Sequence, residues 1–434
     1  MGVLFHDGAV LLPQGKITEN GWVLVEGDKI IRVGEGAVPA DIPADTERRD
    51  LKGGLLMPGL VNAHTHAAMT IFRGLADDKE LMDWLQNYIF PAEAHLTADW
   101  VKWGTTLACA EMIRSGTTCM ADMYLFIKDV ADTVAPIGLR ACIGEVLYDF
   151  LSRSYGELEK GYELTNQFFR KWKGHATVHP VMNAHAPYTC APALLQKAHA
   201  IAVANDVPLH IHVAETEFEF NSIKEKYGAT PLKHLANLGI ADERLMAAHM
   251  VWLSDEELDI AAKNHVKVLH CPVSNMKLAS GAARIPEMLE RGICVGLGTD
   301  GAASNNNLDM FEEMKAAACL HKCHNRQPTA ASAEQVLTMA TNAAAVGLGG
   351  KTGMIVPGQL ADLIVVDFSA AHMHPCYDRV SQVVYAANGA DVRDNMVNGR
   401  WLMKDRKLLT IDEEQAIREV DRVAREVREA IKKK

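Results

Sequence analysis

Residues 55–66 read LLMPGLVNAHTH, an apolar run that ends in two histidines, His64 and His66, separated by one residue. Such a run predicts a buried strand, in which side chains two residues apart point to the same side. His64 and His66 can therefore present two imidazole nitrogens to one divalent metal ion, while Thr65 points away. Taken alone, the pair fits a metal site and an ordinary polar strand end about equally well.

Three further apolar segments end in residues that suit the same ion or its substrate. Residues 207–215 read VPLHIHVAE, residues 245–249 read LMAAH and residues 293–300 read ICVGLGTD. They supply His212 with Glu215, then His249, and then Asp300. Parallel strands buried on both faces are nearly continuous apolar runs, and in an α/β barrel the reactive groups collect where the strands end. We therefore expect these four residues to join the first two histidines in one site.

The middle of the chain alternates predicted strands with amphipathic helices, such as residues 100–113 and 254–262, the second with a serine cap and an acidic first turn. The predicted strands are residues 60–63, 117–123, 140–146, 177–185, 209–214, 245–249, 266–271 and 294–299. Eight strands are the number that closes an α/β barrel. The sequence therefore predicts an α/β fold, a TIM-like (β/α)8 barrel.

Both ends of the chain read as short strands and hairpins, in residues 21–34 near the start and in 358–367 and 392–403 near the end. Neither end alone can cover both faces of a sheet. We expect residues 1–57 and 353–410 to combine into one small β-sandwich domain beside a catalytic barrel of residues 58–352. Residues 411–434 are expected to form a charged C-terminal helix.

Charge and cysteine usage limit the partners and the compartment. The formal net charge of −11 weighs against a nucleic acid polymer or an anionic membrane surface, because both attract clustered Lys and Arg. No segment reads as a membrane span. The nine cysteines are odd in number and scattered, which is typical of reduced thiols. We expect a cytoplasmic protein without membrane contact, and the composition leaves a homo-oligomer open.

A compact group near residue 320, Cys319, His321, Cys323 and His324, resembles a second metal site only superficially. The preceding residues 314–318, MKAAA, read as a helix, in which cysteines at this spacing usually pack. Packing is therefore expected here, with a structural zinc ion as the lesser alternative.

The whole constellation resembles the amidohydrolase superfamily of metal-dependent hydrolases and deaminases. In that pattern the His-x-His lies on barrel strand one, two histidines on strands five and six, and the aspartate on strand eight, in the order found here. The segments PGLVNAHTH (58–66), HVAE (212–215) and GTDGAASNN (298–306) are similar to those of the methylthioadenosine/S-adenosylhomocysteine deaminase group. The resemblance covers most of the chain.

The ligand set predicts one metal ion per chain, bound by His64, His66, His212 and Asp300. Three imidazoles and a carboxylate favour Zn²⁺, although Fe²⁺ and Mn²⁺ fit the same ligand types. Two-metal relatives carry a bridging lysine or carboxylate at the end of strand four. Residues 181–185, VMNAH, offer neither, so a mononuclear site is expected.

The resemblance implies that a water acidified by zinc attacks C6 of a 6-aminopurine. Glu215 would carry protons to the ring nitrogen and the leaving ammonia, Asp300 would accept a proton from the water, and His249 would orient the nucleophile. For the substrate, the resemblance implies that Glu93 accepts the ribose hydroxyls and that His185 donates to a purine nitrogen. Trp84 is a candidate for the pocket wall.

The expected reaction is the zinc-dependent deamination of a purine nucleoside, namely 5'-methylthioadenosine, S-adenosylhomocysteine, adenosine or 5'-deoxyadenosine. Some relatives bind the amino-acid carboxylate of S-adenosylhomocysteine through an arginine near the end of strand three. This chain has Glu145 there. That difference favours the other three substrates. The alternatives are a deaminase or chlorohydrolase of a free ring (guanine, pterin or triazine) and an inactive scaffold on the same fold.

Overall fold

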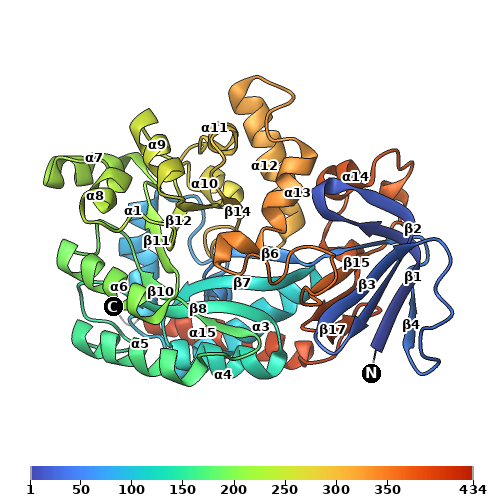
Figure 1. Ribbon diagram of the computed structural model, residues 1–434. Helices are drawn as coiled ribbons and strands as arrows, with labels where there is room; N and C mark the ends of the chain where they lie inside the picture. The colour runs from blue at the N-terminus through green and yellow to red at the C-terminus, as the bar shows by residue number, and fades with distance from the viewer. Residues whose placement is uncertain (1, 433–434) are drawn as a thin grey trace.

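The computed structural model describes residues 2–432 and contains a parallel barrel beside a second sheet (Figure 1). The barrel sheet has the order β6-β7-β8-β10-β11-β12-β13-β14, and β9 pairs with β8. Its strands are β6 (Leu60–Thr65), β7 (Thr117–Tyr124), β8 (Arg140–Leu147), β9 (Val178–Pro180), β10 (Met182–Ala184), β11 (Leu209–Val213), β12 (Leu245–His249), β13 (Lys267–His270) and β14 (Val295–Leu297). The predicted eight-stranded barrel is confirmed, with the fourth predicted strand divided in two at Val181.

The barrel closes at the carboxyl ends of its first and last strands. The backbone N–H of Asp300 donates to the carbonyl of His64 over 2.9 Å. Gly298 makes this approach feasible, because a Cβ there would lie 2.6 Å from the backbone nitrogen of His64. Every residue of β7 and β8 is buried, as expected for parallel strands covered on both faces. The closure brings the end of strand eight against strand one, where the candidate ligands lie.

Helices surround the barrel and connect its strands (Figure 1). The longer ones are α3 (Ala98–Arg114), α4 (Ile127–Ile137), α5 (Leu158–Trp172), α6 (Pro192–Asn205), α7 (Glu217–Tyr227), α9 (Asp255–Lys263), α12 (Met310–Asn325) and α13 (Ala333–Ala340). Shorter helices between the barrel strands are α8 (Pro231–Asn237), α10 (Pro272–Lys277) and α11 (Ile285–Glu290), whereas α14 (Arg379–Tyr385) follows the last barrel strand and contacts α12 and α13. The serine cap predicted before α9 is present, because Ser254 and Glu257 form a reciprocal capping box.

The second sheet contains strands from both ends of the chain, which confirms the predicted β unit. Its order is β18-β17-β16-β15-β5-β1-β2-β3, with β4 paired to β1, so its strands form one branched hydrogen-bonded sheet. The early strands are β1 (Gly2–Leu11), β2 (Ile17–Glu26), β3 (Lys29–Glu35), β4 (Glu47–Asp50) and β5 (Leu55–Pro58). The late strands are β15 (Leu363–Val366), β16 (Val392–Val397), β17 (Arg400–Lys404) and β18 (Lys407–Leu408).

A continuous chain segment and a buried ion pair are among the connections between this sheet and the barrel. Gly59 alone separates β5 from β6, so the same apolar run crosses from one sheet into the other. The guanidinium of Arg140, at the start of β8, pairs with the carboxylate of Asp362 through Nε–Oδ2 and Nη2–Oδ1 distances of 2.6 and 2.8 Å. Both side chains are 1% exposed, so the pair is fully desolvated.

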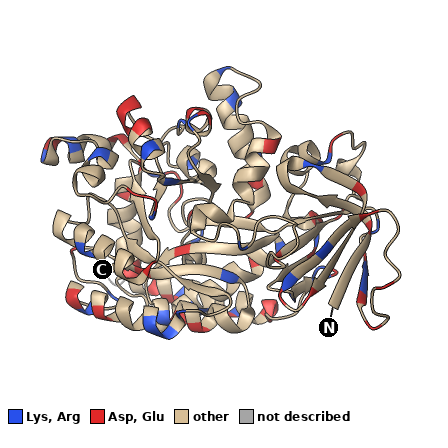
Figure 2. Cartoon of the chain, in the orientation of Figure 1, with Lys and Arg blue, Asp and Glu red and all other residues tan. Residues whose placement is uncertain are grey.

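The C-terminal helix α15 (Glu413–Lys432) packs along α3, where the indole N–H of Trp100 donates to Glu426 over 2.7 Å. Basic and acidic residues are interspersed along the outer helices (Figure 2), and Arg422 on α15 pairs with both Glu419 and Glu426. No helix within residues 2–432 is long and apolar enough to cross a membrane.

Candidate metal centre and active site

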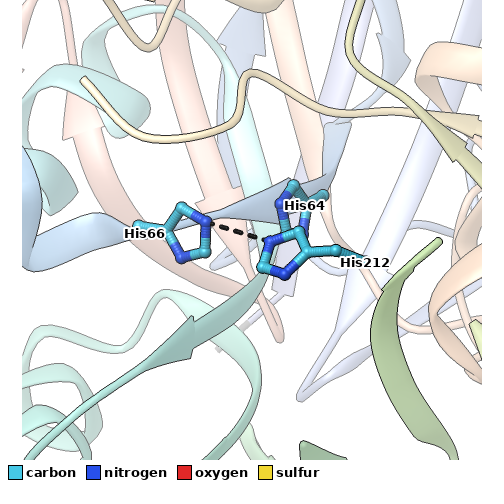
Figure 3. Close-up of side chains that lie close together, drawn as sticks. All are labelled: His64, His66 and His212. Carbon is cyan, nitrogen blue, oxygen red and sulfur yellow. Dashed lines mark hydrogen bonds between the residues drawn. The ribbon is translucent and has the colours of Figure 1, made fainter. Parts of the chain in front are cut away.

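The three predicted histidine ligands converge at the carboxyl end of the barrel (Figure 3). His64 lies within β6, His66 directly follows that strand, and His212 lies on β11. The Nε2 atoms of His66 and His212 are 3.4 Å apart. Oδ1 of Asp300, beyond the end of β14, lies 3.2 Å from Nε2 of His66 and 3.5 Å from Nε2 of His64. The structure therefore brings all four predicted ligands together.

Each histidine is oriented by its other ring nitrogen. Nδ1 of His66 contacts the carbonyl of Met123 at 2.5 Å, and Nδ1 of His212 contacts the carbonyl of His185 at 2.6 Å. Nδ1 of His64 lies 2.8 Å from Nε2 of His210. These contacts turn the three Nε2 atoms toward one another, which is the usual arrangement of histidine ligands around a metal.

Burial keeps two of these rings neutral and so available as ligands. It lowers the pKa of His64 to about 4 and the pKa of His212 well below its ordinary value. Burial opposes ionisation of Asp300, but the adjacent imidazoles of His64 and His66 outweigh it and hold its pKa well below the usual range. Nε2 of His64 is fully buried and has no hydrogen-bond partner. An unpartnered imidazole nitrogen beside a carboxylate and two more imidazoles fits a zinc ion.

The remaining carboxylate oxygen of Asp300 is held by hydroxyl groups. Oδ2 accepts from Ser274 Oγ at 2.6 Å and from Ser304 Oγ at 2.9 Å, while Oδ1 accepts from the backbone N–H of Gly301 at 2.8 Å. These contacts fix the side chain so that Oδ1 faces the histidines.

The two remaining predicted catalytic residues, Glu215 and His249, lie beside the ligands. Nδ1 of His249 lies 2.9 Å from Oδ1 of Asn275, which orients the ring so that its Nε2 is 3.7 Å from Oε2 of Glu215. Burial raises the pKa of Glu215, and the charge of Asp300 adds to the rise while His249 opposes it. A carboxyl with a raised pKa next to a metal site is suited to accepting and releasing a proton.

A cavity opens at this site and is lined by the predicted substrate residues Trp84, Glu93 and His185. The segment α1 (Leu81–Trp84), η3 (Leu85–Ile89, a π-helical turn) and α2 (Phe90–Glu93) covers one side and supplies two of the three. The hydroxyl of Tyr124 donates to Oε1 of Glu93 at 2.8 Å. Nδ1 of His185 contacts the hydroxyl of Thr189 at 2.8 Å.

Sequence reasoning missed several residues that orient the site. His210 stands in the segment HIH (210–212), which repeats the His-x-His spacing of residues 64–66, and this repetition could have identified it. Tyr124 and Asn275 lie in segments without any comparable pattern. Their roles depend on which strand ends meet in space, and a single sequence does not show this directly.

The substrate preference inferred from Glu145 is not supported, because that inference assumed that the Glu145 side chain faces the substrate. Glu145 lies on β8 but does not line the cavity. Its Oε2 accepts the backbone N–H of Ile127 at 2.8 Å, at the first residue of α4. The side chain therefore caps a helix, and its charge gives no information about the substrate.

The Cys319 group on α12 does not converge. Cys319 and Cys323 are exposed, whereas His321 is buried and lies 3.0 Å, Nε2 to Nε2, from His270 at the end of β13. The helix is as predicted, but the expected packing of the cysteines is wrong, because His321 is the buried member of the group. Among the residues described, the candidate metal clusters contain only the ligands already named and His249.

A parallel barrel with three histidines and an aspartate at its carboxyl ends defines a metal-dependent hydrolase. The model of the amidohydrolase family matches residues 55–402, and the chain belongs to this family. This confirms the resemblance and the enzyme class inferred from the sequence.

Relatives with curated names match nearly the whole chain. A 5-methylthioadenosine/S-adenosylhomocysteine deaminase of Syntrophobacter fumaroxidans is 48% identical, covering 98% of both chains. A 5'-deoxyadenosine deaminase of Methanosarcina mazei is 46% identical, covering 96% of this chain and 95% of its own. A solved adenosine deaminase from Xanthomonas campestris with bound zinc has a TM-score of 0.94 at 36% identity and covers 98% of both chains. The zinc in that structure agrees with the predicted cofactor.

Proposed function

We propose that this enzyme hydrolyses the 6-amino group of a purine nucleoside, producing the corresponding inosine analogue and ammonia. The observation that carries the proposal is Glu93, a carboxylate held by Tyr124 in the same cavity as the metal ligands. A carboxylate in this position can accept hydrogen bonds from two neighbouring sugar hydroxyls. A substrate without a sugar has no hydroxyl groups to donate to Glu93.

His64, His66, His212 and Asp300 would hold the zinc ion. When bound, zinc supplies a Lewis acid that makes a water molecule nucleophilic near neutral pH. Asp300 is ionised and faces these ligands, so it is placed to accept a proton from the water. The oxygen of the water forms a bond to C6 and the bond from C6 to the amino nitrogen breaks.

Glu215 moves protons on the substrate side of this reaction. Its protonated carboxyl delivers a proton to N1 of the ring. The proton that Asp300 takes from the water reaches the amino nitrogen before it leaves as ammonia, and the second proton of the water returns from the oxygen at C6 to Glu215 as the carbonyl forms. His249, fixed by Asn275, faces Glu215 over 3.7 Å and orients the attacking oxygen by hydrogen bonding. His185, whose other nitrogen contacts Thr189, donates to a purine ring nitrogen.

The cavity also supports a narrower substrate class at the 5' end of the nucleoside. Outward from the ligands, the ring of His185 lies 6.4 Å from that of Tyr148, and Tyr148 stacks on Phe150 at 4.0 Å. Phe150 lies 6.0 Å from Phe90, one helical turn before Glu93. An aromatic wall therefore adjoins the ribose position and extends to the cavity mouth, where Phe150 is 45% exposed.

None of the described residues that line the cavity is a lysine or arginine. The exposed Arg153, on the loop after β8, donates instead to the carbonyl of Leu96 at 3.1 Å. The amino-acid carboxylate of S-adenosylhomocysteine would therefore meet an aromatic wall without a cation, which is unfavourable. A methylthio or 5'-deoxy group is small, uncharged and suited to aromatic contacts. These observations support 5'-methylthioadenosine and 5'-deoxyadenosine as the preferred substrates.

Hydrolysis of a free ring is the second candidate, because solved structures of a triazine hydrolase and a guanine deaminase share the fold at 21% and 22% identity. That likeness concerns the fold alone. An inactive scaffold would have no use for a complete ligand set beside Glu215 and His249.

Measuring ammonia release by the zinc-loaded protein distinguishes nucleoside deamination from hydrolysis of a free ring and from an inactive scaffold. The panel contains adenosine, 5'-deoxyadenosine, 5'-methylthioadenosine, S-adenosylhomocysteine, adenine and guanine. We expect 5'-methylthioadenosine and 5'-deoxyadenosine to have the highest kcat/KM, S-adenosylhomocysteine to be at least about tenfold lower, and both free bases to be inert. Turnover of a free base above every nucleoside would refute the proposal.

A further inference from the structure

The turn that carries Glu215 has a strained backbone. Ala214 directly follows β11 and has φ of +53°, in the left-handed region that residues with a Cβ seldom adopt. Such conformations are strained and persist only where the surrounding structure holds them. Because Glu215 is the next residue, the direction of its side chain depends on this turn.

The carbonyl side of the turn is held by backbone alone. The carbonyl of Ala214 accepts N–H groups from Val251 at 3.0 Å and from Trp252 at 2.9 Å. The carbonyl of Val213 accepts the N–H of Met250 at 3.0 Å. These bonds tie the turn to the segment after β12, which also carries His249.

The N–H side is held by one side chain, Glu219. This residue lies in the first turn of α7, and its carboxylate reaches back so that Oε1 accepts from the N–H of Ala214 at 2.9 Å and Oε2 from the N–H of Glu215 at 3.0 Å. In an ordinary capping box it would bond the N–H of the cap residue Thr216. Here the donors are instead the N–H groups of Ala214 and Glu215, nearer the strand, and these two residues set the direction of the Glu215 side chain.

We infer that Glu219 is a positioning residue, which locks the left-handed turn at Ala214 and thereby aims Glu215 at the reacting atoms. The inference rests on the proposed function, because it takes the role of Glu215 from there. Glu219 is fully buried, and burial raises its pKa to about 8 against the opposing effect of the two N–H groups. Because Glu219 bonds these two N–H groups and not the N–H of the cap residue of its own helix, its placement points to a role in the site.

Glu257 provides a matched control. It is also fully buried and also the third residue of its helix, α9, where it completes the capping box with Ser254 and accepts the N–H of Leu232 at 3.0 Å. It does not line the cavity. Its removal should lower thermal stability as removal of Glu219 does, without moving a residue of the site.

The experiment compares Glu219→Ala and Glu219→Gln with Glu257→Ala and Glu257→Gln in zinc content, melting temperature, KM and kcat for 5'-deoxyadenosine. For Glu219→Ala we expect zinc near the wild-type level, KM within about threefold, and kcat lower by at least about tenfold, since general acid–base groups contribute about a hundredfold or more when well placed. Glu219→Gln keeps one acceptor oxygen and should lose less. Both Glu257 variants should keep the wild-type kcat per folded molecule.

Three outcomes overturn the inference: a Glu219→Ala enzyme within twofold of wild-type kcat, a loss that follows zinc content or KM, or an equal loss of kcat in Glu257→Ala. If the alanine variant does not fold, the glutamine variant carries the test, with kcat at least about threefold lower at unchanged KM and zinc. A wild-type enzyme that is inactive on every nucleoside refutes the proposed function instead. The two failures are therefore distinguishable.

Discussion

Glu93 allows the sharpest test of the substrate class, because its proposed partners are two hydroxyl groups that can be removed one at a time. The change on the protein is Glu93→Ala, with Glu93→Gln as the variant that keeps the size of the side chain. The change on the substrate is adenosine against 2'-deoxyadenosine and 3'-deoxyadenosine. Neither change touches a metal ligand, so zinc content should stay at the wild-type level.

The magnitude follows from the hydrogen bonds that Glu93 can make. A carboxylate offers about four acceptor positions, and the hydroxyl of Tyr124 occupies one of them on Oε1. A hydrogen bond to a charged group contributes about 1.5–3 kcal/mol, which corresponds to a factor of about ten to about 150 in specificity. The wild-type enzyme should therefore prefer adenosine to either deoxynucleoside by that factor in kcat/KM. In Glu93→Ala the ratio should fall close to one.

The same ratio should depend on pH, because burial raises the pKa of Glu93 to about 7 against the opposing effects of Tyr124 and His66. Above pH 7 the group is ionised and accepts from both hydroxyls. As the pH falls through 7 it gains a proton and loses acceptor capacity, so discrimination should weaken. Ammonia release across the neutral range measures this. A ratio near one in the wild-type enzyme at high pH would refute the ribose assignment.

Further predictions concern the metal and the residues around it. Elemental analysis should find about one zinc per chain, and His64→Ala should lose zinc and activity together. Glu215→Gln should keep its zinc and lose at least about a hundredfold in kcat; an unchanged kcat would remove it from the proton path. His210→Ala should weaken zinc affinity by about ten- to a hundredfold in chelator competition, since it orients His64; unchanged affinity would contradict this. Arg140→Ala should lower the free energy of unfolding by about 3–5 kcal/mol, because Asp362 would stay buried without a partner; denaturant unfolding checks it.

The sequence predicted the barrel and its ligands because both depend on local patterns. Each barrel strand is a short apolar run, and each of four such runs ends in a ligand or a catalytic residue at the position that faces the barrel mouth. Glu93 was predicted on a different basis, from resemblance, since it lies on a helical segment between strands one and two. The periodicity of that segment gives no indication that its last residue enters the cavity.

The residues that orient the ligands were harder to predict, because their partners lie far away in the chain. Asn275 contacts His249 from α10, and Tyr124 contacts Glu93 across 31 positions. The prediction that Glu145 bears on the substrate was wrong for a related reason. Alternation along β8 turns this side chain toward α4, and a one-residue difference in position decides whether a strand residue faces the cavity or a helix.

The strained backbone at the site explains why the sequence there can look ordinary. Ala214, His249 and Asp300 have φ of +53°, +72° and +61°, at the ends of the fifth, sixth and eighth strands. None of these residues is a glycine or an asparagine, the residue types from which a left-handed turn can be predicted in a sequence. Neighbouring side chains bond the groups at these turns. Glu219 accepts the N–H of Ala214, Asn275 contacts the ring of His249, and two serines donate to the carboxylate of Asp300. The catalytic groups thus depend on the pairing between strand ends and the helices that follow them, which is where substitutions outside the ligand set should affect turnover most.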